Sequence, residues 1–159
     1  ARHGDQALYD RVLSAYRHAT TPDDRQQYLN ALGAFSDPAL IRRTIDFALS
    51  PDVRTQDAGR LLARTVSAEG GLQRAWPIIR GRWSEVAKKV SPSFGTMYLV
   101  HALGSGCLSA TAAEVKTFFD AHPAEGVDRT LQQSLERIES CAVLARQQKA
   151  ALAARFADR

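Results

Sequence analysis

The side chains in this sequence that could carry chemistry are its histidines, and their spacing decides which chemistry is open to them. A zinc peptidase helix needs two histidines one turn apart with a glutamate directly after the first, because the imidazoles hold the metal and the carboxylate acts as the base. No histidine here is followed by glutamate and no two lie at helical spacing; the four are His3, His18, His101 and His122. We therefore predict no metal site and no catalytic residue in this chain, and a partly buried, hydrogen-bonded side chain for His101.

Three other stretches are weaker candidates. "GSGCLS" (residues 104–109) has two glycines of a dinucleotide-binding fingerprint, but neither the third glycine nor a preceding strand. "RGRWSEVAKK" (residues 80–89) is the most basic stretch, and a solvated helix face with Trp83 turned inward explains it better than a nucleic-acid contact. Asp23 and Asp24 fall at a helix start, where carboxylates complement the helix dipole. The residues alone indicate no self-contained catalytic group.

Helices are the elements that must position these residues, since apolar spacings of three and four recur along the chain and strand-like alternation does not. Thr21 and Asp37, each followed by proline, predict helix starts. Thr111 and Glu114 predict a capping box. We expect helices at residues 5–19, 22–34, 37–49, 55–67, 72–89, 94–103, 111–121 and 128–157.

Two of these helices have special features. Pro77 predicts a kink or a late start in the fifth. The last one contains no Gly or Pro and carries a single apolar stripe, formed by Leu131, Leu135, Ile138, Cys141, Ala142, Ala145, Leu152 and Phe156. Short helices joined by tight turns pack as antiparallel neighbours and can stack into an array. The predicted fold is all-α: stacked antiparallel helix pairs in a HEAT/armadillo-like superhelix that ends in a long C-terminal helix.

Charge and hydropathy narrow the possible partners. The net charge of +4 is spread evenly, with 11 Lys/Arg and 9 Asp/Glu in residues 1–80 and 10 and 8 in residues 81–159. No basic arm results, so we expect no nucleic-acid partner. No apolar run approaches the ~18 residues that a membrane span needs, so we expect no membrane contact. The sequence does not decide the compartment; we expect a soluble protein, and favour the cytoplasm over other compartments.

Length and cysteine content bound the organisation. The 159 residues suit one helical domain, residues 1–159. Cys107 and Cys141 are too few for a disulfide framework and lack a CxxC spacing. We predict small buried thiols in helices.

Four stretches, taken in order, carry a family resemblance. They are "VRTQDAGRLLARTVS" (53–67), "GLQRAWPIIRGRWSEVAKK" (71–89), "EVKTFFDAHPAEGVDRTLQQSLERI" (114–138) and the terminal helix. Together they resemble the C-terminal helical domain of the zinc aminopeptidases that include puromycin-sensitive aminopeptidase, aminopeptidase N and the endoplasmic-reticulum aminopeptidases, with the puromycin-sensitive branch the most similar.

The resemblance implies a non-catalytic piece of a larger enzyme that removes N-terminal residues from peptides. In that family the zinc and its HExxH ligands, and the GxMEN loop for the substrate's amino group, lie in a separate catalytic domain; neither motif occurs here. The implied partners are the catalytic domain of the same polypeptide and the peptide substrate. The implied role is that of a wall and gate of the substrate chamber, inactive alone. Pro77 departs from the family pattern.

The family's pocket-facing segment corresponds to "SPSFGTMYLVHALGSG" (residues 91–106). On this resemblance the expected substrate-binding residues are Phe94, Tyr98 and Gly106. A core role is the alternative for Phe94 and Tyr98, because aromatic residues one turn apart often pack inward. From a different functional class, a free-standing helical-repeat adaptor that binds protein through its concave face remains open.

Overall fold

The computed structural model describes residues 3–91 and 94–157, and all regular structure within them is helical. The helices are α1 (Gln6–His18), α2 (Pro22–Leu32), α3 (Pro38–Leu49), α4 (Thr55–Ser67), α5 (Gly71–Gly81), α6 (Trp83–Val90), α7 (Gly95–Leu103), α8 (Ser109–Ala121) and α9 (Asp128–Ala157). The predicted all-α class is confirmed. The predicted ranges agree within two residues except in the fifth helix.

Two helix starts form as the sequence predicts. The hydroxyl of Thr21 accepts a hydrogen bond from the backbone amide of Asp24 at 3.1 Å, with Pro22 opening α2. Asp37 accepts from two first-turn amides of α3, at 2.8 and 3.1 Å. Both side chains satisfy amides that have no partner inside the helix, which fixes where α2 and α3 begin.

The predicted capping box at Thr111 is wrong. Helix α8 begins at Ser109, and no side chain caps its start, so Thr111 lies inside the first turn. The amide of Thr111 is bonded instead to the carbonyl of Leu108 at 2.9 Å. Glu114 turns away from the helix start and forms an ion pair with Arg80 of α5. The contact between helices therefore decides the position of this carboxylate.

The fifth predicted helix is two helices. Helix α5 begins before Pro77, so its start is not late, and the interruption lies at Arg82 between α5 and α6. The Arg82 amide bonds to the Ile79 carbonyl at 3.2 Å, which tightens the last turn of α5. The Arg82 guanidinium pairs with Asp46 of α3 and with Glu85. The hydrogen bond that Arg82 donates to Asp46 is the main reason that the pKa of Arg82 is raised, and those it donates to Glu85 add to it. The same bonds link the start of α6 to α3.

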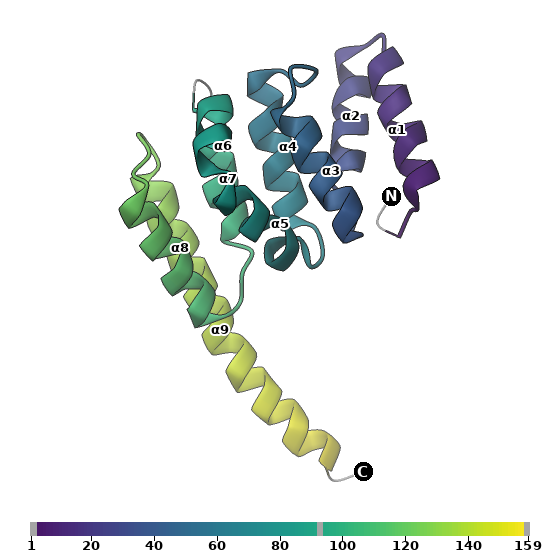
Figure 1. Cartoon of the computed structure of the whole chain (residues 1–159). Helices are drawn as coiled ribbons and strands as arrows, with labels where there is room; N and C mark the ends of the chain where they lie inside the picture. Colours follow the sequence, from purple (N-terminus) through teal and green to yellow (C-terminus); the bar gives the residue numbers. More distant parts are fainter. Residues whose placement is uncertain (1–2, 92–93, 158–159) are drawn as a thin grey trace.

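The helices run roughly in chain order from α1 at one end of the array to α8 and α9 at the other (Figure 1), but the most extensive contact joins α4 to α7, which are not neighbours in the chain. Helix α4 is central and contacts α3, α5 and α7, while α9 packs on α7 and α8. One hydrophobic core runs through the array, from Tyr9 of α1 through Ile45, Leu62 and Leu99 to Phe119 of α8. The array is therefore held together by continuous apolar burial, the main favourable term in folding.

An aromatic cluster joins α8 to α5 and α6. The rings of Trp76 and Phe118 meet edge to face with centroids 4.9 Å apart, and those of Trp83 and Phe119 do so at 5.5 Å. His122 stacks on Phe118. Both tryptophans are buried, as predicted for Trp83. Edge-to-face contacts add to the free energy gained from burying such large rings.

Helix α9 has two unlike halves. Its first half is buried on one side, where Ile138 and Ala142 are almost inaccessible. Residues 143–149 are all exposed, and Figure 1 shows this half projecting beyond the other helices. The predicted stripe thus meets the body only up to Ala142. Its last members, Leu152 and Phe156, have side chains outside the described residues.

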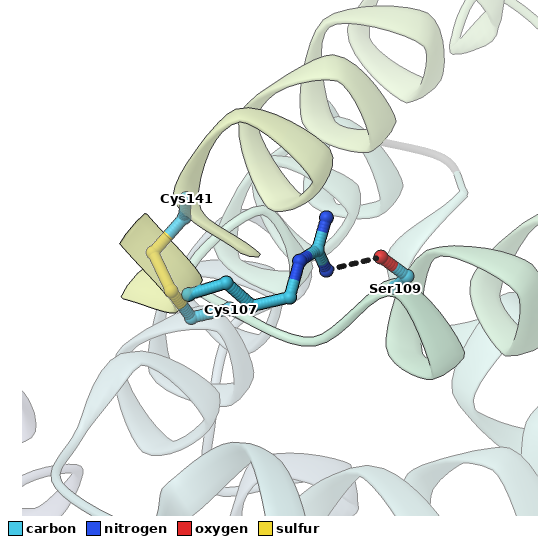
Figure 2. The surroundings of a disulfide bond; sticks show 4 residues. Cys107, Ser109 and Cys141 are labelled. Atoms are coloured by element: carbon cyan, nitrogen blue, oxygen red, sulfur yellow. Dashed lines mark hydrogen bonds between the residues drawn. A yellow bond between two sulfur atoms is a disulfide. The ribbon is translucent and has the colours of Figure 1, made fainter. Parts of the chain in front are cut away.

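The prediction of two free, helical thiols is wrong. Cys107 lies in the loop between α7 and α8, and it forms a disulfide with Cys141 of α9 (Figure 2). The two residues are 34 apart in sequence, and the fold brings their Cα atoms to 4.9 Å, within the range of disulfides. Sequence spacing carries no sign of such a pairing, because it depends on how α9 packs against the loop.

Candidate functional site

The first turn of α7 carries two of the predicted substrate-binding residues. Phe94 directly precedes α7 and its side chain is 75% exposed, while Tyr98 one turn later is 36% exposed. The Tyr98 amide bonds to the Phe94 carbonyl at 3.2 Å, so one helical turn fixes their spacing. The core alternative for this pair is wrong, because both rings reach the surface.

A close crossing of α4 and α7 positions the Tyr98 ring. Gly59 of α4 lies against Gly95 of α7 so tightly that a Cβ atom on Gly59 would overlap the Gly95 backbone. The lack of side chains at this point brings the next residue of α4, Arg60, beside Tyr98. The Arg60 guanidinium donates a hydrogen bond to the Tyr98 hydroxyl at 3.2 Å and stands over its ring, 5.1 Å from the centroid.

The Arg60–Tyr98 pair presents hydrogen-bonding groups and an aromatic ring at the surface. The Tyr98 hydroxyl accepts from Arg60, which leaves its own proton available to a carbonyl group. The guanidinium has further N–H donors, and its contact with the ring fixes its direction. Sequence reasoning missed Arg60, because 38 residues separate it from Tyr98. The local sequence shows only that a glycine precedes each residue: Gly59 comes directly before Arg60, and Gly95 comes three residues before Tyr98.

Phe94 belongs to a different surface from Tyr98. It lines a cavity of about 440 Å³ between the start of α7 and the connection from α8 to α9. Thr96, Met97, Glu125 and Val127 also line this cavity, whereas Tyr98 does not. The structure therefore places the two predicted aromatic residues on neighbouring surfaces.

Gly106 lies apart from both aromatic residues. It is buried in the loop before α8, and a Cβ atom there would come within 2.9 Å of Thr111, 3.1 Å of Leu72 and 3.5 Å of Ile138. This close contact with α5, α8 and α9 favours a packing role. Its contact with substrate stays a prediction, as it does for Phe94 and Tyr98.

Arg54 and Asp57 form an ion pair at 2.7 Å at the beginning of α4, with the Asp57 side chain buried. His101, expected to be partly buried, is exposed near the end of α7. The buried face of that short helix is already filled by Leu99, Val100 and Leu103.

The described residues do not fit a metal centre. No group of three His, Cys, Asp or Glu side chains in residues 3–91 and 94–157 is placed to hold a metal ion. Zinc chemistry therefore enters no step that we derive for this chain. None of the helices formed by these residues could span a membrane.

Comparison with known proteins identifies the family. The family model of the ERAP1-like C-terminal domain matches residues 1–140. The alanine/arginine aminopeptidase of Saccharomyces cerevisiae is 28% identical over 144 residues, which cover 88% of this chain and 17% of the relative. Aminopeptidase M1 of Arabidopsis thaliana is 28% identical over 139 residues, which cover 87% of this chain and 16% of the relative. Aminopeptidase M1-B of Oryza sativa is 30% identical over 134 residues, which cover 84% of this chain and 15% of the relative.

The chain thus spans about a sixth of the length of these relatives, and the alignments cover most of the chain itself. The family match begins at the first residue and extends through the first half of α9. It includes the α4/α7 crossing and the Arg60–Tyr98 pair. On the family match and the helical fold together, this chain belongs to the ERAP1-like C-terminal domain family, a helical domain shared with aminopeptidases.

Proposed function

We propose that this chain is one helical domain of a zinc metalloaminopeptidase and that it forms a wall and gate of the substrate chamber. The Arg60–Tyr98 pair is the observation that carries the proposal. It presents an aromatic ring and a guanidinium at the surface, on a crossing of two helices that cannot shift easily because their backbones touch. A rigid support of this kind suits residues that must hold a peptide in one position.

The chain's own residues bind and orient; they do not catalyse. Tyr98 would contact the side chain of the peptide's first residue through its ring, and Arg60 would keep the ring in place. The ring offers an apolar first residue a contact that Tyr98→Ala would remove, whereas the exposed Arg60 guanidinium beside it would still attract an acidic one. The catalytic domain and its zinc would belong to the same polypeptide outside this chain, and movement of the helical array against that domain would close the chamber and exclude water.

Kinetics of the intact enzyme test this role. Tyr98→Ala in the full-length protein should lower kcat/KM for substrates with an apolar first residue by roughly 10- to 200-fold, the value of one lost apolar contact. Acidic substrates should lose less. His101→Ala, an exposed change on the same helix, is the matched control. Equal losses for all substrates, or none, would remove Tyr98 from the pocket.

The chain alone gives an independent test. We expect the purified 159-residue protein to contain no zinc and to leave fluorogenic aminoacyl substrates uncleaved. Activity should require the catalytic portion supplied in trans. Stoichiometric zinc with turnover that a chelator abolishes would refute the non-catalytic role.

The helical-repeat adaptor is the alternative from a different class. The two proposals differ in the reading frame upstream of this chain. A frame that encodes HExxH and GxMEN in continuity with residue 1 supports the aminopeptidase domain. A frame that lacks both motifs supports the adaptor.

A further inference from the structure

The projecting half of α9 forms one side of an uncovered groove. The groove holds about 400 Å³ and lies between the start of α8 and the segment of α9 that follows Ala142. Its lining includes Leu108, Ala110, Ala142, Ala145, Arg146 and Lys149, and we call these six residues the α9 groove. The α9 residues that line it lie beyond residue 140, where the family match ends.

The floor and wall of the α9 groove are built for an apolar helix. Three alanines, Ala110, Ala142 and Ala145, line it, and such small side chains let another backbone approach closely. Leu108 lines the same groove and is 63% exposed, so its side chain is available to a partner. The neighbouring disulfide between Cys107 and Cys141 ties the loop that carries Leu108 to α9. The apolar wall is therefore covalently fixed against the floor.

The charge of the α9 groove is positive. Arg146 and Lys149, three residues apart, stand on the same side of α9, and within the described residues neither forms an ion pair. Arg146 reaches the hydroxyl of Ser109 at 3.5 Å, the dashed contact in Figure 2. Glu139 accepts from the same hydroxyl at 2.7 Å and lies about two turns before Arg146 on α9.

We propose that the α9 groove is a docking site for an amphipathic helix of a partner protein, with an apolar stripe bordered by Asp or Glu. The stripe would pack on Leu108 and the alanines, and the carboxylates would meet Arg146 and Lys149. Helix-in-groove recognition reads apolar residues spaced one turn apart, and charge beside the stripe sets direction and selectivity. Burial of Leu108 gives affinity, and the two cations select an acidic partner.

Charge also separates this occupant from a second copy of the chain. Residues 141–157 contain three basic residues and no Asp or Glu. Two projecting halves packed together would bring like charges into contact, which disfavours pairing. An acidic helix meets no such repulsion.

A synthetic helix tests the proposal directly. The probe is a fluorescein-labelled peptide of about 18 residues, five helical turns, with leucines at one-turn spacing and glutamates on both borders of the stripe. A second peptide has lysine at every glutamate. Fluorescence anisotropy with the complete, oxidised chain should show binding of the glutamate peptide, and roughly 10-fold weaker binding of the lysine peptide.

Variants locate the binding. Arg146→Glu with Lys149→Glu should weaken binding of the glutamate peptide by roughly 10-fold or more and strengthen binding of the lysine peptide. Leu108→Asp should weaken the binding of both peptides. Arg11→Glu with Arg42→Glu makes the same charge change on exposed positions of α1 and α3 and should leave both affinities unchanged. All the substituted side chains lie at the surface, and circular dichroism checks that each variant folds.

Several outcomes would overturn the proposal. They are no binding of the glutamate peptide, equal binding of both peptides, and equal binding by the Arg146/Lys149 variant and the unaltered chain. Sedimentation velocity that shows a dimer lost on Leu108→Asp would assign the groove to a second copy. Binding to phosphatidylserine vesicles that is lost in the Arg146/Lys149 variant would assign it to a lipid surface.

Discussion

At the α4/α7 crossing, Gly59 and Gly95 bring two backbones into direct contact, whereas at the start of the projecting half of α9 a disulfide joins the loop before α8 to the helix. The first junction is surrounded by the hydrophobic core and depends on the absence of side chains at the two glycines. The second lies at the margin of the core, where the buried Ala142 is followed by the exposed residues 143–149, and depends on a covalent bond.

The difference shows how the two candidate binding surfaces are supported. The Arg60–Tyr98 pair sits on the crossing, so packing alone holds it in place. The α9 groove lies where little packing is available, and a cross-link replaces the missing burial. Changes at the two junctions should therefore destabilise different parts of the molecule. Loss of the crossing should destabilise the whole array, and loss of the disulfide should destabilise α8 and α9.

The disulfide should give the largest effect. Replacing Cys107 and Cys141 with serine frees a loop of 34 residues, which chain-entropy reasoning values at roughly 4 kcal/mol of unfolding free energy. Urea unfolding of the oxidised protein and of the double variant measures the loss. Hydrogen exchange should become faster in α8 and α9 and stay slow in α3 and α4. Equally faster exchange in all four helices would show that the two junctions are not separate.

Burial along α9 should give the next largest effect. Ile138→Ala empties a fully buried position and should cost roughly 3 kcal/mol, by lost burial and the cavity left behind. Leu144→Ala, one and a half turns later, removes a side chain that is 56% exposed and should change stability by less than about 0.5 kcal/mol. Similar losses for both, measured by urea unfolding, would mean that the projecting half is covered in solution.

A substitution at the α4/α7 crossing should give the third largest loss of stability. Gly59→Ala adds a Cβ atom that overlaps backbone, and overpacking costs about 3 kcal/mol, offset by about 1 kcal/mol of helix propensity. We expect a net loss of about 2 kcal/mol. Gly81→Ala, where no atom lies within 4 Å of the added Cβ, is the matched control and should be neutral or slightly stabilising. A neutral Gly59→Ala in thermal or urea unfolding would show that the crossing can open without cost.

The smallest effect concerns the far end of the array. The Tyr9 hydroxyl accepts from Thr44 at 3.2 Å in the core, so Tyr9→Phe should cost about 1 kcal/mol. Burial raises the pKa of Tyr9, which means that folding favours the neutral phenol. Its contribution is therefore complete below the ordinary tyrosine pKa near 10 and is lost as the pH rises through the raised value.

Unfolding measured between about pH 8 and pH 11 checks this sign. The unaltered chain should lose stability at the alkaline end, and Tyr9→Phe should lose less. Tyr16, whose pKa burial also raises, accounts for part of the remaining slope. A steeper alkaline loss in Tyr9→Phe would contradict the assignment.

The sequence predicted the helices well because their determinants are local. Thr21 and Asp37 cap helices through atoms within three residues, and apolar spacing marks which face each helix buries. The break at Arg82 escaped prediction because it is stabilised by Asp46, 36 residues away. The position of Glu114 escaped it for the same reason, since its ion pair with Arg80 is a contact between helices.

The candidate site was only partly predictable. The family resemblance pointed to the segment that carries Phe94 and Tyr98, but only the fold shows that they face different surfaces and that Arg60 joins Tyr98. The disulfide depends on the approach of a loop to α9, which no spacing rule encodes. The α9 groove, likewise, exists only because α9 outruns the helices that it packs on.

The aromatic cluster has a consequence for optical spectroscopy. The chain has two tryptophans, and both lie in the seam between α5, α6 and α8, in contact with the same two phenylalanines. Tryptophan fluorescence, excited at a wavelength that the four tyrosines do not absorb, therefore reports the solvent exposure of that seam alone. A change confined to α1–α3 or to the projecting half of α9 would leave the emission spectrum as it was, so an unaltered spectrum is no sign that those regions are intact.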